Sequence, residues 1–251
     1  MSKLLRTLSL MVAFVCLGAP VAAETTAAEK QEIEQIVRDY LLAHPERIEE
    51  AITLLRQKRE QEAAAAQVKA IEENGPQIFD STHQMVLGNP EGKITLVEFF
   101  DYNCGYCKRA VSDMNALLEA NPDLRIVMKE FPILSEGSVE AARVSIAVKD
   151  KAPQSYLKFH QELFNRPGQV TGAKALEVAK DLGLDPTALQ AAANADDVTG
   201  NLQEVQKLAE LLGISGTPSY VIGKELVPGA AGYDALQEKV AAMRQCGEAT
   251  C

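Results

Sequence analysis

Two cysteines separated by two residues, Cys104 and Cys107, are the residues of this chain whose spacing most directly predicts chemistry. Such a pair can close a small-ring disulfide when the start of a helix holds both side chains on one side of the backbone. The unpaired N–H groups and the dipole of a helix start stabilise a thiolate, the species that attacks a disulfide sulfur. Cys104 is therefore the predicted nucleophile, and Cys107, one turn further in and less exposed, is predicted to resolve the mixed disulfide.

The residues on either side of the pair predict the elements that position it. Residues 94–100 form a β-rich apolar run typical of a buried strand, residues 108–120 have a helical pattern, and residues 124–131 form a second strand candidate. Strand, helix and strand in this order make a βαβ unit, whose crossover connection requires parallel strands. This context favours redox chemistry for the cysteine pair.

A zinc site is the alternative for the pair, because half of a four-cysteine site has the same spacing. The other two ligands would be Cys246 and Cys251, which have a four-residue spacer at the end of the chain. A terminal bracing disulfide is the favoured interpretation of these two cysteines. His160 is expected to be a packing or helix-surface residue, and His44 and His83 form no constellation with the cysteines. No metal site and no cofactor are predicted.

Glu98 lies in the middle of the apolar run at 94–100, six residues before Cys104. On a solvent-facing side of the strand it would be an ordinary surface acid. On a strand buried on both faces, the carboxylate would be poorly hydrated and its pKa would rise. The second interpretation is favoured, since an acid with a raised pKa suits proton exchange with Cys107.

The run Gly216-Thr217-Pro218-Ser219 is a further signal, because it stands immediately before a strand candidate rather than in an ordinary surface turn. X-Pro bonds are cis in only about 5–6% of cases in folded proteins. The position of this proline before a strand nevertheless favours a cis bond between Thr217 and Pro218.

The composition excludes a wholly disordered chain and argues against a nucleic-acid partner. The chain has 251 residues, 47% of which are hydrophobic, and its formal net charge is -10. That hydrophobic content is enough for a packed core. An acidic sequence such as this one offers no basic surface that would neutralise phosphates.

Residues 1–23 are typical of a secretory signal, with two basic residues, an apolar run and small residues before position 24. We expect cleavage near Ala23 and export to the periplasm. A lipoprotein anchor at Cys16 is a less favoured alternative, because the two residues before it are not small.

Residues 24–75 are predicted to form a helical oligomerisation region and linker. Good helix formers dominate this region, and apolar side chains recur at helical spacing in two stripes that His44-Pro45 separates. The stripes consist of Ile33, Ile36, Val37, Tyr40 and Leu41, and of Ile48, Ile52 and Leu55. Short amphipathic helices cannot bury such faces alone. Self-association is the favoured interpretation, and packing on the catalytic domain is the alternative.

Residues 76–251 are predicted to form the catalytic domain, with a helical insert at about 138–213. Turn signals divide the helical patterns of the insert. These signals are Arg166-Pro-Gly, Gly183-Leu-Asp-Pro186 and Thr199-Gly. Two short strand candidates and a final helix close the chain, at 219–222, 225–227 and about 233–244.

Two motifs in the catalytic region resemble the DsbA-like branch of thioredoxin-fold proteins: Val97-Glu-Phe-Phe-Asp-Tyr-Asn-Cys-Gly-Tyr-Cys107 and Gly216-Thr-Pro218. The segment Ile36-Val-Arg-Asp-Tyr-Leu-Leu-Ala-His-Pro45 is similar to the oligomerising segment of ScsC-type proteins, the suppressor-of-copper-sensitivity thiol-disulfide proteins. The resemblance covers nearly the whole mature chain. It implies an α/β protein with a thioredoxin-like fold and a helical insertion, preceded by an N-terminal helical oligomerisation region.

The resemblance also implies roles for particular residues. Pro218 would be cis and lie beside the cysteine pair, where Thr217 offers backbone groups to an extended substrate strand. Gly105 and Tyr106, between the cysteines, would contribute to substrate binding. Glu98 would be the acid behind the second cysteine.

The family attacks protein disulfides, and its oligomeric members tend to be isomerases. The dipeptide Gly105-Tyr106 departs from the Pro-His of strongly oxidising members, and a tyrosine cannot place a cationic donor near the thiolate as a histidine would. We therefore predict a disulfide isomerase that acts on misfolded envelope proteins as a homo-oligomer, a trimer by resemblance, with a membrane electron donor that keeps the pair reduced. The alternatives are a dithiol oxidase that introduces disulfides and a non-catalytic copper or zinc binding envelope protein.

Overall fold

The computed structural model describes residues 26–251, so the predicted secretory signal at 1–23 lies outside the described residues. The chain divides into two compact units, residues 1–59 and residues 60–251. Within the described part of the chain, no helix has the length and apolar character needed to cross a membrane.

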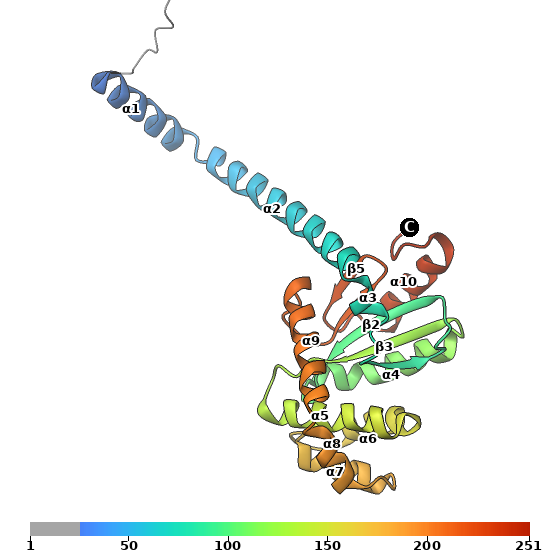
Figure 1. Ribbon diagram of the computed structural model, residues 1–251. Helices are drawn as coiled ribbons and strands as arrows, with labels where there is room; N and C mark the ends of the chain where they lie inside the picture. The colour runs from blue at the N-terminus through green and yellow to red at the C-terminus, as the bar shows by residue number, and fades with distance from the viewer. Residues whose placement is uncertain (1–25) are drawn as a thin grey trace, which may run out of the picture. The chain divides into compact units, whose positions relative to one another are not determined.

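The described part of the first unit is helical (Figure 1). Helix α1 (Ala27–Ala43) begins at a capping box, in which Thr26 and Glu29 satisfy each other's backbone N–H groups. It ends before His44-Pro45, and helix α2 (Glu46–Glu73) begins directly afterwards, which confirms the predicted interruption. The predicted apolar stripes leave large side chains exposed, including Ile36 at 61% and Ile52 at 45%.

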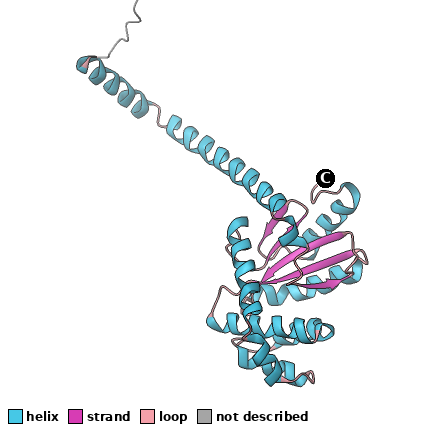
Figure 2. Ribbon diagram, viewed as in Figure 1, coloured by secondary structure: helices cyan, strands magenta, loops and turns pink. Residues whose placement is uncertain are grey.

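The second unit is built on a five-stranded mixed sheet (Figure 2). The strands are β1 (Met85–Gly88), β2 (Ile94–Phe100), β3 (Leu124–Glu130), β4 (Ser219–Ile222) and β5 (Glu225–Pro228). Their order across the sheet is β1-β3-β2-β4-β5. Strands β2 and β3 are parallel and flank helix α4 (Gly105–Ala120) in the chain, which confirms the predicted βαβ unit. The other pairings are antiparallel.

Alternation along β2 divides the core between the two faces of the sheet. Leu96 and Phe100 belong to one cluster, with side chains from α4 and from helix α10 (Tyr233–Cys246). Val97 and Phe99 belong to the other cluster. Its remaining members come partly from the end of α2, from helix α3 (Gly75–Phe79) and from helix α9 (Asp196–Leu212). Both faces are therefore covered, and the middle of β2 is dry.

Helices occupy the chain between β3 and β4. They are α5 (Glu136–Lys151), the short 3-10 helix η1 (Pro153–Ser155), α6 (Tyr156–Asn165), α7 (Gly172–Asp181), α8 (Pro186–Ala193) and α9. The first two predicted turn signals lie between helices, and Asp185 caps α8. The turn predicted at Thr199-Gly is wrong, because both residues lie inside α9. A helical glycine costs only about 1 kcal/mol relative to alanine, and burial of Val205 and Leu208 on this helix outweighs that cost.

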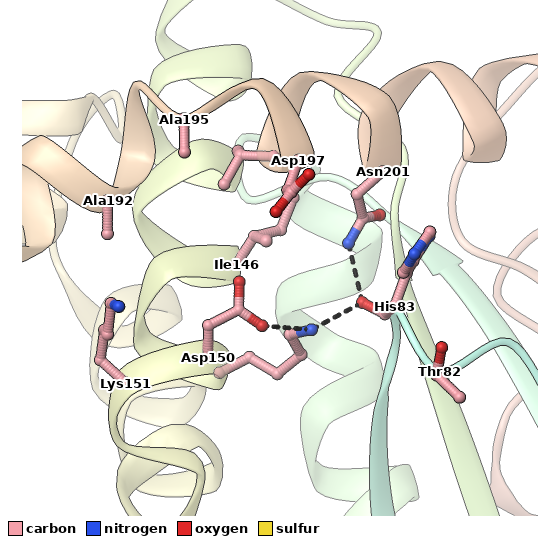
Figure 3. Close-up of a pocket in the computed structure, with 11 residues that line it drawn as sticks. Thr82, His83, Ile146, Asp150, Lys151, Ala192, Ala195, Asp197 and Asn201 are labelled. Carbon is pink, nitrogen blue, oxygen red and sulfur yellow. Dashed lines mark hydrogen bonds and ion pairs between the residues drawn. The ribbon is translucent and has the colours of Figure 1, made fainter.

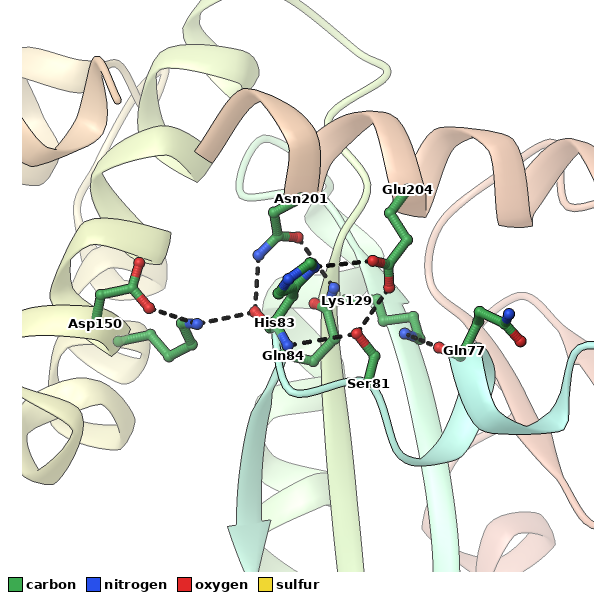
Figure 4. Close-up of polar contacts among 9 residues, drawn as sticks. Gln77, Ser81, His83, Gln84, Lys129, Asp150, Asn201 and Glu204 are labelled. Carbon is green, nitrogen blue, oxygen red and sulfur yellow. Dashed lines mark hydrogen bonds and ion pairs between the residues drawn. The ribbon is translucent and has the colours of Figure 1, made fainter. Parts of the chain in front are cut away.

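The edge strand β1 and the short helix α3 were not predicted from the sequence. A polar network fixes the segment between them (Figure 4). Lys129 on β3 is fully buried, which lowers its pKa to about 8, and its Nζ donates to the carbonyl of Gln77 at 2.9 Å. Glu204 on α9 accepts from the Ser81 hydroxyl at 2.7 Å and pairs with His83 Nδ1 at 2.9 Å. These contacts depend on residues far apart in the sequence.

The C-terminus is closed by the predicted disulfide between Cys246 and Cys251. The loop inside this disulfide places Ala249, which is 5% exposed, in the main core cluster. At the same end of the unit, Arg244 donates to the carboxylate of Asp123, just before β3. The predicted disulfide between these two cysteines is therefore confirmed.

Candidate active site

Helix α4 begins directly after Cys104, which is its N-cap residue. The backbone N–H of Cys107 donates to Cys104 Sγ at 3.3 Å, and the Cys104 thiol donates to the carbonyl of Thr217 at 3.1 Å. Cys104 is 7% exposed and Cys107 is 1% exposed, and both thiols are free. A sulfur at this position faces the unpaired N–H groups of a helix start, an arrangement that favours an anion.

Cys107 is buried in the core cluster that α4 shares with one face of the sheet. Burial raises the pKa of the Cys107 thiol, and the nearby charge of Glu98 raises it further. Glu98 lies in the middle of β2, paired in register with Met128 on one side and Tyr220 on the other. Its side chain is on the face of the sheet that α4 covers.

Glu98 is 4% exposed, and burial raises its pKa to about 8, with a further contribution from the charge of Asp113. The predicted burial and the predicted direction of the pKa shift are therefore confirmed. A carboxyl group with a pKa near neutral exchanges protons readily at working pH.

The loop before β4 provides the other side of the site. The peptide bond between Thr217 and Pro218 is cis, as predicted, and the carbonyl of Thr217 is the group that Cys104 contacts. A cavity of about 180 Å³ lies beside this loop, and Thr217 and Pro218 line it. Gly105 and Tyr106 are exposed, Tyr106 at 60%, with the Arg109 guanidinium 4.3 Å from the centre of its ring. The residues predicted for substrate binding thus surround Cys104.

A larger cavity of about 460 Å³ contains none of the predicted site residues (Figure 3). It lies between α5, the start of α9 and the segment of His83. The carbonyl of His83 accepts from Lys149 Nζ at 3.0 Å and from Asn201 Nδ2 at 2.8 Å. These contacts tie the segment before β1 to two helices, and neither Cys104 nor Cys107 lines the cavity.

His160 is a buried packing residue, as one of the two predicted interpretations states. It lies among aromatic rings, and its Nδ1 is 3.1 Å from the hydroxyl of Tyr102. Burial lowers its pKa to about 3, so the ring is neutral at physiological pH. The sequence pattern did not reveal that this histidine is connected to the strand that leads to Cys104.

The zinc alternative for the cysteine pair is wrong, because its two remaining ligands, Cys246 and Cys251, are joined in a disulfide. Among residues 26–251, no group of three or more His, Cys, Asp or Glu side chains is arranged to hold a metal ion. The chemistry that this site offers is therefore thiol chemistry at Cys104 with a buried thiol and a buried acid behind it.

Two polar residues just before Cys104, Asp101 and Asn103, were missed by sequence reasoning. Asp101 is 1% exposed, and its carboxylate accepts backbone N–H groups from Asn103, Ile133 and Leu134. The only signal in the sequence is their position, as polar residues between a buried strand and a reactive cysteine.

The sequence matches two protein families. Residues 95–241 match the DSBA-like thioredoxin domain, and residues 29–62 match the copper resistance protein ScsC N-terminal domain. The first match contains the cysteine pair, Glu98 and Pro218. The second match contains both predicted apolar stripes.

Solved structures and a curated relative agree with these matches. A thioredoxin-like oxidoreductase from Silicibacter pomeroyi is 40% identical, with 68% of this chain and 98% of that chain covered and a TM-score of 0.65. A linker-deletion mutant of Proteus mirabilis ScsC is 30% identical, with 89% and 99% covered and a TM-score of 0.67. Disulfide bond formation protein D of Bacillus subtilis is 25% identical over 62% of this chain and 75% of that protein.

The chain also aligns with 25% of the length of the Na(+)/H(+) antiporter NhaA 1 of Salinispora arenicola, at 26% identity. A match over a quarter of a protein carries nothing about the activity of the whole. The DSBA-like domain, in contrast, extends over more than half of the present chain and contains the whole thiol site. The chain therefore belongs to the DsbA-like thioredoxin family of thiol-disulfide oxidoreductases.

Proposed function

We propose that this oxidoreductase is a disulfide isomerase of the bacterial periplasm, which acts on misfolded envelope proteins. Cys104 is the nucleophile, Cys107 is the resolving thiol and Glu98 is its acid-base partner. Gly105, Tyr106, Thr217 and Pro218 form the surface that holds the substrate. Periplasmic location is supported by the secretory signal predicted at residues 1–23.

Isomerisation at this site needs no net electron transfer. The Cys104 thiolate attacks one sulfur of a wrong substrate disulfide, so that a bond forms between Cys104 Sγ and that sulfur, and the substrate S–S bond breaks. The released substrate thiolate takes a proton from solvent. A different substrate thiolate then attacks the substrate sulfur of the mixed disulfide. A new substrate disulfide forms, and Cys104 leaves as a thiolate.

Cys107 provides an exit when no substrate thiol completes the exchange. The ionised fraction of Glu98 accepts the proton of Cys107, and the resulting thiolate attacks Cys104 Sγ. The substrate leaves reduced, and the enzyme keeps the Cys104–Cys107 disulfide. A dithiol donor must then supply two electrons and two protons to restore the reduced pair. We assign this step to a membrane electron donor.

The observation that carries the isomerase proposal is the exposed apolar stripe of the first unit. Ile33, Ile36 and Val37 on α1 are each at least half exposed, and water disfavours such a continuous apolar face on a short helix. Association of the stripes from several chains, a trimer by resemblance, would bury them. Several reduced sites would then face one substrate, which must remain bound through repeated exchanges.

The test is recovery of a scrambled multi-disulfide protein by the reduced enzyme, with molecular mass measured in parallel. We compare the mature protein, a stripe variant with Ile33→Lys and Val37→Lys, and Cys104→Ser. The stripe variant should be monomeric and should lose at least about tenfold in recovery, because one site cannot hold the substrate through several exchanges. Gln31→Lys, an exposed polar position on the opposite side of α1, is the matched control.

Two results would reject parts of the proposal separately. Full recovery by a monomeric stripe variant would remove the role of assembly. Full recovery by Cys104→Ser would remove the assigned nucleophile. Any truncation used instead should end at residue 59, because Ile71 on α2 is 1% exposed and packs in the core of the second unit.

The second candidate function is a dithiol oxidase. The contact that favours it is the N–H of Cys107 on Cys104 Sγ, since stabilising a thiolate stabilises the reduced pair and makes the disulfide a stronger oxidant. The redox state of the pair in extracted protein separates the two functions. A pair found almost wholly as the disulfide would favour the oxidase, and a reduced pair would favour the isomerase.

A further inference from the structure

The three residues before the nucleophile each connect it to a different part of the chain. Asp101 accepts the N–H of Ile133 at 2.9 Å and that of Leu134 at 3.0 Å on one carboxylate oxygen, and the N–H of Asn103 at 2.7 Å on the other. The carbonyl of Asp101 accepts the N–H of Cys104 at 3.0 Å. Asp101 therefore joins the nucleophile to the segment that follows β3.

Tyr102 connects the same loop to the interior of the helical region. Its hydroxyl is 2.8 Å from Ser145 Oγ on α5 and 3.1 Å from His160 Nδ1 on α6. Both partners are buried, as is the tyrosine ring at 4% exposure. These hydrogen bonds lie in a dry environment, where an unpartnered hydroxyl or imidazole would be costly.

Asn103 uses its whole amide group. Its Oδ1 accepts the N–H of Val170 at 2.8 Å, and its Nδ2 donates to the carbonyl of Val170 at 2.9 Å. The same nitrogen donates to Ser138 Oγ on α5 at 3.0 Å. A side-chain amide that pairs with both backbone groups of one residue is fixed in direction as well as position. Val170 lies between α6 and α7, so this contact joins the start of α4 to the connection between these two helices.

We propose that Asn103 is a positioning residue, through which the helices between β3 and β4 hold Cys104 in its reactive place. The inference rests on the assignment of Cys104 as the nucleophile. Cys104 Sγ lies between the N–H of Cys107 and the carbonyl of Thr217. A shift of Asn103 moves the adjoining Cys104 out of this arrangement. In-line attack on a disulfide then becomes slower, because small misplacements of reacting atoms have large kinetic effects.

The helix itself offers a matched control for this proposal. Asn121 is the C-cap of α4, is 2% exposed, and uses its amide fully. Its Nδ2 donates to the carbonyl of Leu117 at 2.9 Å and to Gln237 Oε1 at 2.7 Å, and its Oδ1 accepts from Arg244 at 2.9 Å. Asn103→Ala and Asn121→Ala therefore remove equivalent amide groups from the two ends of one helix.

Three quantities are measured for the mature protein and each variant: resistance to urea, the rate of attack of the reduced protein on oxidised glutathione, and the equilibrium of the pair with glutathione. Both variants should lose similar stability. Asn103→Ala should slow the attack roughly tenfold or more, and Asn121→Ala should change it less than about twofold. Loss of a positioned N–H donor to the thiolate should also move the glutathione equilibrium of Asn103→Ala toward the protein disulfide. Asn121→Ala should leave that equilibrium unmoved.

Equal slowing by the two alanine variants, or an unchanged rate and equilibrium in Asn103→Ala, would overturn the proposal. Ser138→Ala covers the case in which Asn103→Ala does not fold, because it removes one acceptor of the same amide. It should slow the attack roughly threefold, and an unchanged rate would count against the proposal. Cys104→Ser distinguishes the nucleophile assignment of Cys104 from the positioning role of Asn103. Exchange that survives in this variant would reject the nucleophile assignment, whereas a normal rate in Asn103→Ala rejects only the positioning role.

Discussion

Two buried carboxyl groups lie on the same face of the sheet, and they differ in the hydrogen bonds that neighbouring side chains donate to them. Glu130 on β3 accepts hydrogen bonds from Tyr156 at 2.8 Å and from Ser145 at 2.9 Å. Glu98 on the neighbouring strand β2 has no hydrogen bond from a side chain of residues 26–251, although it is equally buried at 4% against 3% exposure. Burial raises the pKa of both groups.

This difference in hydrogen bonding indicates that Glu130 has a structural role, whereas Glu98 is the acid whose pKa lies near neutral. At Glu130 the hydrogen bonds from Tyr156 and Ser145 oppose the effect of burial on the pKa, and they also fix α5 and α6 to the sheet. At Glu98 nothing opposes burial, and the charge of Asp113 adds to it, so the pKa reaches about 8. Glu98 is thus a buried acid without a side-chain hydrogen bond among residues 26–251, and its charge raises the pKa of the Cys107 thiol, the group whose acid-base partner we propose it to be. This costs stability at neutral pH and is a signature of a functional site.

The largest expected effect is on the pH dependence of stability in Glu98→Gln. Between the ordinary pKa of 4.5 and about 8, the folded protein keeps a proton on Glu98 that the unfolded chain has released, so stability falls as pH rises. At about 1.4 kcal/mol per pKa unit, the full loss is about 5 kcal/mol. Urea unfolding from pH 5 to pH 8 should give a flatter curve for Glu98→Gln than for wild type.

Glu119→Gln, an exposed position on α4, is the control for Glu98→Gln and should keep the wild-type slope. A slope that Glu98→Gln leaves intact would contradict the assigned titration. The same variant should release substrate from the mixed disulfide roughly a hundredfold more slowly, because Cys107 loses its acid-base partner.

The next largest effect is the loss of stability in Glu130→Ala. This variant leaves the Ser145 and Tyr156 hydroxyls without their acceptor and opens a cavity, for an expected cost of about 3–5 kcal/mol. Glu130→Gln keeps one acceptor oxygen and should cost about 1–2 kcal/mol. Denaturant midpoints at pH 7 measure both. An equal loss of stability in Glu98→Ala and Glu130→Ala would contradict the difference that we draw between an acid with side-chain hydrogen bonds and an acid without them.

A smaller effect is expected when one donor to Glu130 is removed. Tyr156→Phe keeps the ring, which is fully buried, and removes only the hydroxyl, at an expected cost of about 1–2 kcal/mol. Tyr233→Phe is the matched variant, since among the described residues its hydroxyl has no hydrogen-bond partner. Thermal unfolding of both variants should separate them, and identical midpoints would show that the bond to Glu130 contributes nothing.

The smallest effect is expected from Asp113→Asn. The charge of Asp113 is the second cause of the raised pKa of Glu98, after burial. Its removal should lower that pKa and leave it above 4.5, because burial is the larger cause, and a carboxyl carbon NMR titration would detect the change. A return of the Glu98 pKa to its ordinary value would mean that charge, and not burial, controls this group.

Much of the thiol site could be predicted because its signals are local. The strand at 94–100, the cysteine spacing and the helix that follows lie within a few turns of one another, and the continuous apolar run around Glu98 is the pattern of a strand covered on both faces. The proline before β4 carries its own signal in the same way. The predicted turn at Thr199-Gly failed because a local preference of about 1 kcal/mol was outweighed by tertiary packing of α9.

The sequence by itself determined the thiol pair, since the identity and spacing of Cys104 and Cys107 and the helical pattern after them predict two thiols at a helix start. Only the tertiary structure decided what surrounds them. Asn103 meets Val170 across 67 residues, and Tyr102 meets His160 across 58. Hydrogen bonds between such distant residues have no periodicity or spacing to reveal them, because the fold alone brings their atoms within reach. The same reason left β1 and the partners of Glu130 unpredicted.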